Sequence, residues 1–394
     1  MEKALQGLRV IDFTWVLAGP FATRILAEYG AEVIKVQSEV TMGATQHNLS
    51  GYFNTWNRNK LGIALSLSQP QGIEVAKRLI QISDVVVENF SPRVMENWGL
   101  DYPTLRKIKP DLIMLSLSGM GQTGPRRDYI AFGATIQALS GLTYLTTFPG
   151  RPPLGLGYSY ADHIAGSMGA LAILQALEYR QKTGEGQYID LAELEAMSTL
   201  LGTAILDYGV NHRVASPLGN RPAHRIAAPH GAYRCKGEDR WCAIAVFTKE
   251  EWQAFCQVLG YPSWTREKRF ATPLDRWQNI DQLDPLVEEW TKERSAEEVM
   301  TLLQEVGIAA GVVQDAADLW QDPQLKARGF FVELDHPVLG RTFSDGSPIK
   351  LSDTPAHFQQ AAPLLGQHNE YVYRHLLGMS REEIERYTEG GILI

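Results

Sequence analysis

The sequence predicts an α/β fold, with a large domain built on a Rossmann-like open parallel sheet and a smaller α+β domain. Segments typical of strands and of helices alternate from residue 8 to about residue 195. Strand-like runs such as Val85–Val87 are continuously apolar, which indicates strands buried on both faces. The pattern changes near residue 215, and a length of 394 residues favours two domains.

Six strand-like runs define the expected sheet, and helical patterns separate them. The expected strands are Leu8–Phe13, Glu32–Val36, Gly62–Leu67, Asp84–Glu88, Asp111–Ser116 and Gln187–Leu191. Pro70 can open the helix after the third strand, because proline is favoured in the first turn of a helix. No GxGxxG pattern follows the first strand, so the fingerprint of a dinucleotide-binding enzyme is missing.

The chain after residue 215 is predicted to form a smaller domain and a third segment. We expect the large domain at 1–215, the small domain at 216–324 and a C-terminal segment at 325–394. An extended linker leads into a hairpin with its turn at 236–239, and a strand follows at 308–314. Serine or threonine followed three residues later by glutamate predicts helix starts at Thr248, Ser295 and Ser380.

Composition limits the possible partners. The formal net charge is −8, which argues against nucleic acid or an anionic membrane as the main partner. No signal-peptide pattern is visible and no apolar run reaches the length of a membrane span, so we expect a cytoplasmic protein. Cys235, Cys242 and Cys256 lack metal-ligand spacing and no HxxxH pair occurs, so we predict no metal and no tightly bound cofactor.

The segment from Tyr158 to Gly169 contains the first candidate for chemistry. One acidic residue, Asp162, stands where a helix is expected to begin, and small residues follow it. As an N-cap, this aspartate would only start the helix. At an accessible helix N-terminus, the same carboxylate could attack an electrophile. The adjacent His163 would point elsewhere on a helix, so we interpret it as structural or exposed.

Further motifs carry a resemblance to a known family. They are Asp12–Pro20, Asn57–Leu67, Asp84–Pro92, Tyr158–Leu191, Leu325–Phe331 and Ala362–Asn369. Several separated motifs occur in the family's order over nearly the whole chain. The sequence therefore resembles the class III CoA-transferases of the CaiB/BaiF type, the family of formyl-CoA transferase and carnitine CoA-transferase. The resemblance implies that 325–394 returns to the large domain. It also implies an interlocked homodimer, with a homologous sister subunit in some relatives.

The resemblance aligns Asp162 with the family's nucleophilic aspartate. It implies that CoA moves from an acyl-CoA donor to a free carboxylic acid through an aspartyl anhydride and an aspartyl-CoA thioester. Splitting one transfer between two covalent intermediates makes each step easier. CoA thioester is then a substrate, and succinyl-CoA is a reasonable donor because it is common in the family.

Candidates for the oxyanion and substrate pocket follow from the same comparison. The backbone N–H of Ala18 could donate to an oxyanion, and Leu17 stands where the family has a glutamine. Trp15 and Phe132 suggest an apolar pocket, and Phe132 stands where formyl-CoA transferase has a tyrosine. No glycine-rich loop of the family type is found. The segment with His230 and Gly231 is its nearest substitute, and His224 and Arg225 lie close by in the sequence.

A CoA site is expected at the carboxyl ends of the strands, where open α/β sheets bind ligands. By resemblance, Leu65, Ser68, Asn89, Phe90 and Ser91 line it, and the nearby basic residues Arg58, Lys60 and Arg93 could contact phosphates. Two family arginines are replaced by Ser38 and Asn97. This protein must therefore neutralise the phosphates of CoA differently from formyl-CoA transferase.

Three other functions remain open on the sequence. A racemase of α-methylacyl-CoA thioesters needs two acid/base groups around an α-carbon. The family's histidine is absent from Arg126–Phe132, where Asp128 or Tyr129 would have to replace it. An intramolecular CoA-transferring isomerase would show the same residues as a transferase. A non-catalytic CoA-binding subunit would be signalled by loss of the aspartate, which is present.

Overall fold

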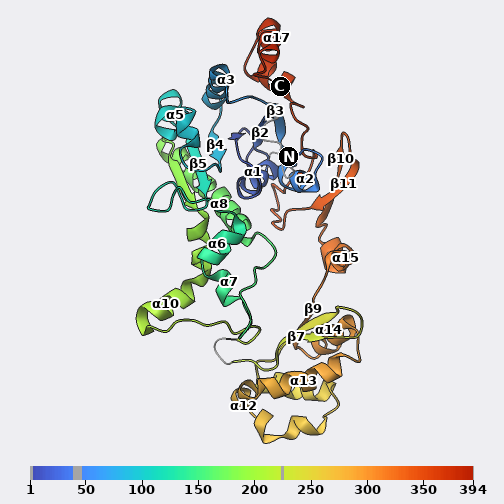
Figure 1. The fold of residues 1–394 in the computed structure, drawn as a ribbon. Coiled ribbons are helices and arrows are strands. Elements are labelled where there is room, and N and C mark those ends of the chain that lie inside the picture. Colours follow the sequence, from blue (N-terminus) through green and yellow to red (C-terminus); the bar gives the residue numbers. More distant parts are fainter. Residues whose placement is uncertain (1–2, 39–46, 223–225, 394) are drawn as a thin grey trace. The chain divides into compact units, whose positions relative to one another are not determined.

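The computed structural model of the protein describes residues 3–38, 47–222 and 226–393 (Figure 1). The chain forms two compact units. Unit 1 contains Met1–Thr143, Gly155–Val214 and Lys326–Ile394, and unit 2 contains Tyr144–Leu154 and Ala215–Leu325. The sequence boundaries placed 144–154 in the large domain, whereas the structure groups this segment with unit 2.

Unit 1 is built on a six-stranded parallel sheet with the strand order β3-β2-β1-β4-β5-β6. All six predicted strands are confirmed. They are β1 (Arg9–Asp12), β2 (Glu32–Gln37), β3 (Leu61–Ala64), β4 (Val85–Glu88), β5 (Ile113–Ser118) and β6 (Tyr188–Ala192).

The strands of this sheet are buried on both faces because helices cover both faces, except for the edge strand β6, which is partly exposed. One face carries Ile11, Ile34 and Val86, which pack in a cluster with α3 (Pro70–Gln81) and α5 (Tyr102–Ile108). The other face carries Val10, Val33, Val85 and Val87, which pack against α1 (Ala18–Glu28) and α8 (Tyr160–Thr183). This burial explains the continuous apolar runs of the sequence.

The direction of strand addition reverses between β1 and β4, since β2 and β3 extend the sheet on one side and β5 and β6 on the other. The loops after β1 and β4 therefore meet at the carboxyl edge, where open α/β sheets bind ligands. Asn89 joins the two loops. Its side chain accepts a hydrogen bond from the backbone N–H of Trp15 at 2.8 Å and donates one to the Trp15 carbonyl at 2.9 Å.

The remaining helices of unit 1 are short apart from α10. They are α2 (Gly51–Asn57), α4 (Val94–Asn97), α6 (Gly133–Leu139), α7 (Leu142–Leu145, at a unit boundary), α9 (Glu193–Ser198), α10 (Gly202–Asn211), α16 (Pro323–Ala327, at a unit boundary) and α17 (Arg381–Glu389). A 3-10 turn at Thr199–Leu201 precedes α10, and a π-helical turn occupies Glu370–Leu376. The predicted cap of the last helix is confirmed, because the Ser380 hydroxyl accepts from the Glu383 N–H.

The C-terminal segment packs on unit 1 through the antiparallel hairpin of β10 (Phe331–His336) and β11 (Gly340–Asp345). Asp345 at the end of β11 forms ion pairs with Arg24 and Arg58. The second strand of this hairpin ends at Asp345.

Unit 2 contains an antiparallel sheet of β7 (His230–Arg234), β8 (Trp241–Ala245) and β9 (Ala309–Val312). The predicted hairpin and strand are confirmed. Helices cover this sheet, and the capping boxes predicted at Thr248 and Ser295 begin two of them. The helices are α11 (Lys249–Val258), α12 (Pro273–Gln278), α13 (Ile280–Thr291), α14 (Ala296–Gln304) and α15 (Ala316–Gln321). In the described part of the chain, no helix has the length and apolar character to cross a membrane.

Candidate active site

Asp162 lies in the first turn of α8, but it is not the cap of this helix. Ser159 occupies the N-cap position, and Asp162 is the third residue of the helix. The Ser159 hydroxyl donates a hydrogen bond to the Asp162 carboxylate, and the backbone N–H of Ala18 donates another. The interpretation of Asp162 as the N-cap is therefore wrong, because Ser159 occupies the cap position and Asp162 lies inside the first turn.

Ala18 is the first residue of α1, so the carboxylate of Asp162 is held at the start of a second helix. The preceding Val16 adopts a positive φ of 60°, which is strained for a β-branched residue. This turn lets Leu17 and Ala18 enter α1 beside α8. Backbone N–H groups at a helix start favour negative charge, because they have no partner within their own helix.

Two glycines permit the close approach of the neighbouring elements. A Cβ at Gly166 would lie 2.6 Å from the carbonyl oxygen of Ala18, so only glycine lets α8 pack this closely on α1. A Cβ at Gly133, the first residue of α6, would lie 2.6 Å from Oδ2 of Asp162 and closer still to the Ser159 hydroxyl. The surroundings of Asp162 thus combine the beginnings of α1, α6 and α8.

Burial raises the pKa of Asp162 above its ordinary value. The hydrogen bonds from Ser159 and Ala18, and the nearby His163, limit this rise because they stabilise the carboxylate. No lysine or arginine forms an ion pair with Asp162 in the described residues. A desolvated carboxylate without a bound cation keeps its lone pairs free for attack on an electrophile.

His163 is partly buried and packs among aromatic side chains. Its ring lies 4.9 Å from the ring of Tyr158 and 5.2 Å from each of the rings of Phe21 and Trp56. Tyr52 of α2 also lies near Asp162. Burial, followed by the negative charge of Asp162, raises the pKa of Tyr52 to about 12, so its hydroxyl stays protonated.

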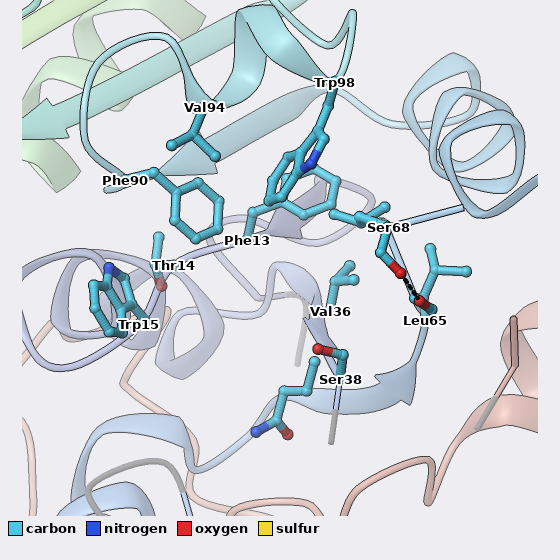
Figure 2. A pocket seen from close by; sticks show the side chains of 13 residues that line it. Phe13, Thr14, Trp15, Val36, Ser38, Leu65, Ser68, Phe90, Val94 and Trp98 are labelled. Atoms are coloured by element: carbon cyan, nitrogen blue, oxygen red, sulfur yellow. Dashed lines mark hydrogen bonds between the residues drawn. The ribbon is translucent and has the colours of Figure 1, made fainter. Parts of the chain in front are cut away.

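A cavity of about 600 Å³ lies at the carboxyl ends of β1, β2, β3 and β4 (Figure 2). Figure 2 shows Phe90 and Trp98 pointing into the same region, and their rings meet edge to face with centroids 5.3 Å apart. The lining residues carry no charge. They are Phe13, Thr14, Trp15, Val36, Gln37, Ser38, Leu65, Ser66, Leu67, Ser68, Phe90, Val94 and Trp98. An uncharged cavity with aromatic walls suits a flat aromatic group.

This geometry can be compared with that of known proteins. The sequence profile described as "CoA-transferase family III" matches residues 5–369. The chain belongs to this family. It is therefore a CoA-transferase, and its substrates include CoA thioesters.

Curated relatives of the family cover almost the whole chain. The chain is 33% identical over 389 residues to "Succinyl-CoA--D-citramalate CoA-transferase" of Chloroflexus aurantiacus, covering 97% of this chain and 96% of the relative. It is 33% identical over 419 residues to "Formyl-CoA:oxalate CoA-transferase" of Rhodopseudomonas palustris, covering 100% of this chain and 98% of the relative. It is 34% identical to the beta subunit of "Succinyl-CoA--L-malate CoA-transferase" of C. aurantiacus, covering 96% of each chain.

Solved structures show the same fold. A CaiB/BaiF family protein from Brucella suis superposes with a TM-score of 0.87 at 31% identity, covering 95% of this chain and all of that one. Rv3272 from Mycobacterium tuberculosis superposes with a TM-score of 0.82 at 27% identity, covering 94% of this chain and 99% of that one. The α/β architecture predicted from the sequence is therefore that of the family.

Several predicted residues of the CoA-transferase site come together in unit 1. Trp15, Leu65, Ser68 and Phe90 line the cavity. Leu17 is buried directly before α1, with 3% of its surface exposed. Ala18 contacts Asp162 through its backbone N–H. The side chain of Phe132 is 60% exposed, so in one chain it does not close the pocket around Asp162, although the next residue is Gly133.

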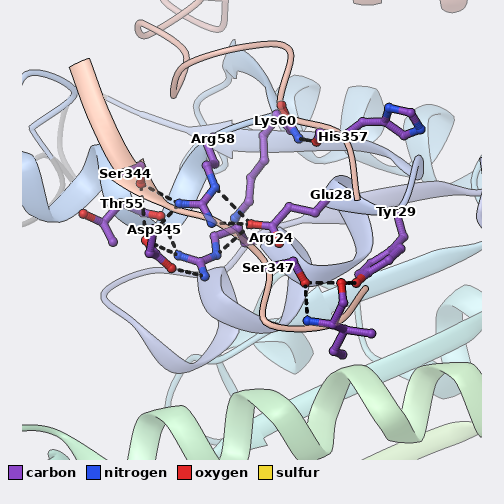
Figure 3. A network of polar contacts seen from close by, with 12 residues as sticks. Arg24, Glu28, Tyr29, Thr55, Arg58, Lys60, Ser344, Asp345, Ser347 and His357 are labelled. Carbon is purple, nitrogen blue, oxygen red and sulfur yellow. Dashed lines mark hydrogen bonds and ion pairs between the residues drawn. The ribbon is translucent and has the colours of Figure 1, made fainter. Parts of the chain in front are cut away.

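The structure contradicts the assignment of Arg58 and Lys60 to the CoA phosphates (Figure 3). Both side chains are fully buried. Arg58 pairs with Glu28 at 2.6 Å and with Asp345 at 3.0 Å, and Lys60 pairs with the buried Asp12 at 2.9 Å. Burial would leave these cations unstable without carboxylate partners, so they stabilise the fold and do not reach a phosphate.

Asn89 and Ser91, which were expected to line the CoA site, lie outside the cavity. Asn89 braces the Trp15 loop with its side chain and does not line the cavity. Ser91 and Arg93 face a second hollow, on the side of α4 away from the cavity, and Arg93 pairs with Asp128 at 3.0 Å. Asn89 and Ser91 therefore do not line this cavity, whereas a phosphate contact from the exposed Arg93 stays a prediction.

Asp128 and Tyr129, the residues considered for a racemase, lie at the surface. Asp128 pairs with Arg93 and Arg127, and 62% of the surface of Tyr129 is exposed. Neither has the buried position that an acid/base pair beside Asp162 would need.

His230 and Gly231 lie on β7 in unit 2, where they line a hollow of about 440 Å³. The Nδ1 atom of His230 contacts the carbonyl oxygen of Asn220. His224 and Arg225 lie outside the described residues. An oxyanion role for His230 and Gly231 therefore remains a prediction.

Sequence reasoning missed Ser159, Gly133, Tyr52 and Glu193. Ser159 stands three residues before Asp162, a spacing typical of a helix start, and this pattern could have identified it. The others are brought to Asp162 by tertiary packing alone. In the described residues, no cluster of three or more histidine, cysteine, aspartate or glutamate side chains could hold a metal ion.

Proposed function

We propose that this protein moves CoA from an acyl-CoA donor to a free carboxylic acid through covalent intermediates on Asp162. The observation that carries this proposal is the partly buried carboxylate of Asp162, held by Ser159 and the start of α1 and without a cation partner in the described chain. A thioester carbonyl is an electrophile that such a carboxylate can attack.

Each step exchanges one acyl bond for another. An oxygen of Asp162 attacks the thioester carbonyl, the C–S bond breaks, and CoA leaves as a thiolate from a mixed anhydride. The thiolate attacks the aspartyl carbonyl, which releases the donor acid and leaves an aspartyl-CoA thioester. The acceptor carboxylate attacks this thioester and again releases CoA thiolate. The thiolate then attacks the acyl group of the acceptor and frees Asp162. No step consumes or releases a proton.

The backbone around Ala18 supports the oxyanions in this sequence. Its N–H already donates to the resting carboxylate of Asp162. When the thiolate or the acceptor attacks the aspartyl carbonyl carbon, the same N–H and the start of α1 lie beside the negative charge that develops on the aspartyl oxygen. This arrangement uses the backbone at residue 18 and does not need the glutamine that Leu17 replaces.

The cavity at the carboxyl ends of the strands is the proposed site for the nucleotide part of CoA. Phe90 and Trp98 offer aromatic faces and edges for the adenine ring. The hydroxyl oxygens of Ser66 and Ser68 are joined by a hydrogen bond of 2.8 Å and lie at the end of β3, where they line the cavity. No metal or tightly bound cofactor enters the proposed reaction.

The donor and the acceptor are proposed only by class. Succinyl-CoA is our proposed donor, because two of the relatives are named for its use. The acceptor is a carboxylic acid, and the half-exposed Trp15 suggests that it carries an apolar part.

A second copy of the chain is the proposed partner. In unit 1, α8 and α10 expose large apolar side chains, among them Leu171, Leu174, Ile205, Leu206 and Val210. Such apolar surface favours association. Two of the relatives are named as alpha and beta subunits, so a sister subunit is the alternative. Light scattering of the purified protein tests this proposal: a mass of one chain would contradict a homodimer.

A thioester exchange screen tests the function. Purified protein is mixed with succinyl-CoA, and separately with acetyl-CoA, and a panel of free carboxylic acids, and new thioesters are identified by mass spectrometry. We expect a new acyl-CoA with the native protein and none with Asp162→Ala. Turnover by Asp162→Ala would contradict the assignment. Deuterium uptake at the α-carbon without exchange would indicate a racemase, and movement of CoA within one diacid would indicate an isomerase.

A further inference from the structure

Glu193 is a buried carboxyl group at the carboxyl edge of the sheet. It follows β6 directly and is the first residue of α9. The preceding residue, Ala192, pairs with Ser118 at the end of β5. Only 8% of the surface of Glu193 is exposed. A glutamate is rarely buried to this extent without a partner.

The packing of α9 brings Glu193 to the nucleophile. Met197 of α9 packs in one cluster with Ala161, and Ala196 packs in another with Ala18 and Ala165. Ala161 and Ala165 flank Asp162 on α8. Helix α9 therefore places Glu193 next to the first turns of α8, and the negative charge of Asp162 disfavours the ionised form of Glu193.

The charged groups on the elements that pack against Glu193 are few. Helix α8 supplies Asp162 and His163, and β6 supplies Tyr188 and Asp190, whose carboxylate accepts a hydrogen bond from the Gln122 N–H. Helix α6 and the turn Thr199–Leu201 carry no titratable side chain, and Glu195 of α9 itself is exposed. In the described chain no lysine or arginine pairs with Glu193.

A buried carboxyl group near a second, partly buried carboxylate is costly to ionise. The carboxylate of Asp162 is stabilised by Ser159, the Ala18 N–H and His163. Glu193 has no comparable contact. Burial, followed by the charge of Asp162, raises the pKa of Glu193 to about 8. At neutral pH the proton therefore resides on Glu193 and the negative charge on Asp162.

We propose that Glu193 is a positioning residue of the transfer reaction: its neutral form leaves Asp162 as the only anion at the site, and its ionised form slows the attack of Asp162 on the acyl-CoA. No bond to Glu193 forms or breaks, and its proton stays in place. The tetrahedral intermediate is negatively charged, so a second carboxylate nearby raises its free energy. This inference rests on the proposed function of Asp162.

The pH dependence of the transfer rate tests this role. For the native protein, we expect kcat/KM for the acyl-CoA to fall above a pH of about 8, by about tenfold per pH unit. Glu193→Gln mimics the neutral acid and cannot ionise, so we expect its profile to lose this fall, whatever its maximal rate. The matched control Glu195→Gln, on the exposed side of the same helix, should keep it. A native profile without the fall, or a fall that persists in Glu193→Gln, would overturn the proposal.

A second measurement does not depend on turnover. Infrared spectroscopy at pH 7 should show a protonated carboxyl band that loses intensity in Glu193→Gln and keeps it in Glu195→Gln, with the remaining intensity coming from Glu88. An unchanged band in Glu193→Gln would overturn the proposal. If the native protein transfers no CoA at all, the proposed function fails, while the infrared result still decides where the proton resides.

Discussion

Asp162 has the environment of a nucleophile because its contacts stabilise its charge without blocking it. Ser159 and the Ala18 N–H hold the carboxylate in place, and burial removes water from it. A helix cap would instead bond to the N–H groups of its own first turn. The difference between these roles lies in the neighbouring helix α1, which a local pattern around residue 162 does not reveal.

The close contact between Gly133 and Asp162 allows a test of the role of the Asp162 carboxylate. In Gly133→Ala the new Cβ would lie 2.6 Å from Oδ2 of Asp162, so the carboxylate must move. We expect kcat/KM to fall by at least about tenfold, since small displacements of reacting groups have large effects on rate. The control Gly202→Ala, with nothing within 4 Å of its new Cβ, should retain native activity. Steady-state kinetics with both variants decide this, and native kinetics in Gly133→Ala would show that Asp162 is not displaced.

The hydroxyl of Ser159 controls the ionisation of Asp162. Its hydrogen bond lowers the pKa of Asp162 against the effect of burial, so Ser159→Ala should raise that pKa further. The acid limb of the kcat/KM profile should then move to higher pH, with activity lost more at low pH than at pH 8. Ser198→Ala removes a hydroxyl that bonds only to the Leu194 carbonyl and should leave the limb in place. If the acid limb of the kcat/KM profile stays at the same pH in Ser159→Ala, the ionisation of Asp162 does not determine that limb.

At the scale of elements, the loop after β1 connects the cavity with Asp162, the proposed nucleophile. Phe13, Thr14 and Trp15 line the cavity, and three residues later Ala18 contacts Asp162. Asn89 fixes this loop to the end of β4. A ligand at the carboxyl ends of the strands can therefore place its reactive end near α8, because one short loop borders both places.

Glu88 at the end of β4 gives a prediction for stability. Burial raises its pKa to about 7, although hydrogen bonds from Ser116 and the Phe90 N–H oppose this rise. The folded pKa lies above the unfolded value of 4.5, so the stability contribution is complete below pH 4.5 and is lost as the pH rises towards 7. Glu88→Gln cannot ionise, and it should exceed the native protein by about 1–3 kcal/mol at pH 8.

Urea unfolding at pH 4.5 and at pH 8 measures this difference. The exposed Glu96→Gln on α4 is the control and should show no such dependence on pH. If Glu88→Gln differs from the native protein by the same amount at both values, Glu88 does not titrate as the burial of its carboxyl group implies.

The elements could be predicted from the sequence better than the site. Continuous apolar runs identified all six strands, and the pairs Thr248–Glu251 and Ser295–Glu298 identified two helix starts. The sequence could not predict that the Arg58 side chain is buried in ion pairs. Its partners Glu28 and Asp345 lie 30 and 287 residues away in the sequence. Glu193 escaped notice for the same reason. Its neighbour Asp162 is on another helix, and only the packed fold brings the two carboxyl groups together.

At the scale of the whole molecule, buried ion pairs join the two ends of unit 1. Figure 3 shows Arg24 and Arg58 between Glu28 of α1 and Asp345 of the C-terminal hairpin. Removing one member of a buried network leaves the other charges without compensation. The C-terminal segment therefore contributes to the stability of the part of the fold that carries α1.

Asp345→Ala tests this connection. We expect a loss of about 3 kcal/mol in the free energy of unfolding, because Arg58 has no access to water. Glu333→Ala in the same hairpin removes the partner of the exposed Arg341 and should cost less than about 1 kcal/mol. Denaturant unfolding of both variants gives the comparison. Equal effects would mean that the buried network does not hold the hairpin.

The central claim is that Asp162 becomes covalently attached to CoA, and peptide mass spectrometry tests it most directly. The protein is mixed with succinyl-CoA, quenched within one turnover and digested. We predict that the peptide containing Asp162 gains the mass of CoA less one water, and that Asp162→Ala gains nothing. Transfer of CoA without an adduct on Asp162, or with an adduct on another residue, would contradict the mechanism.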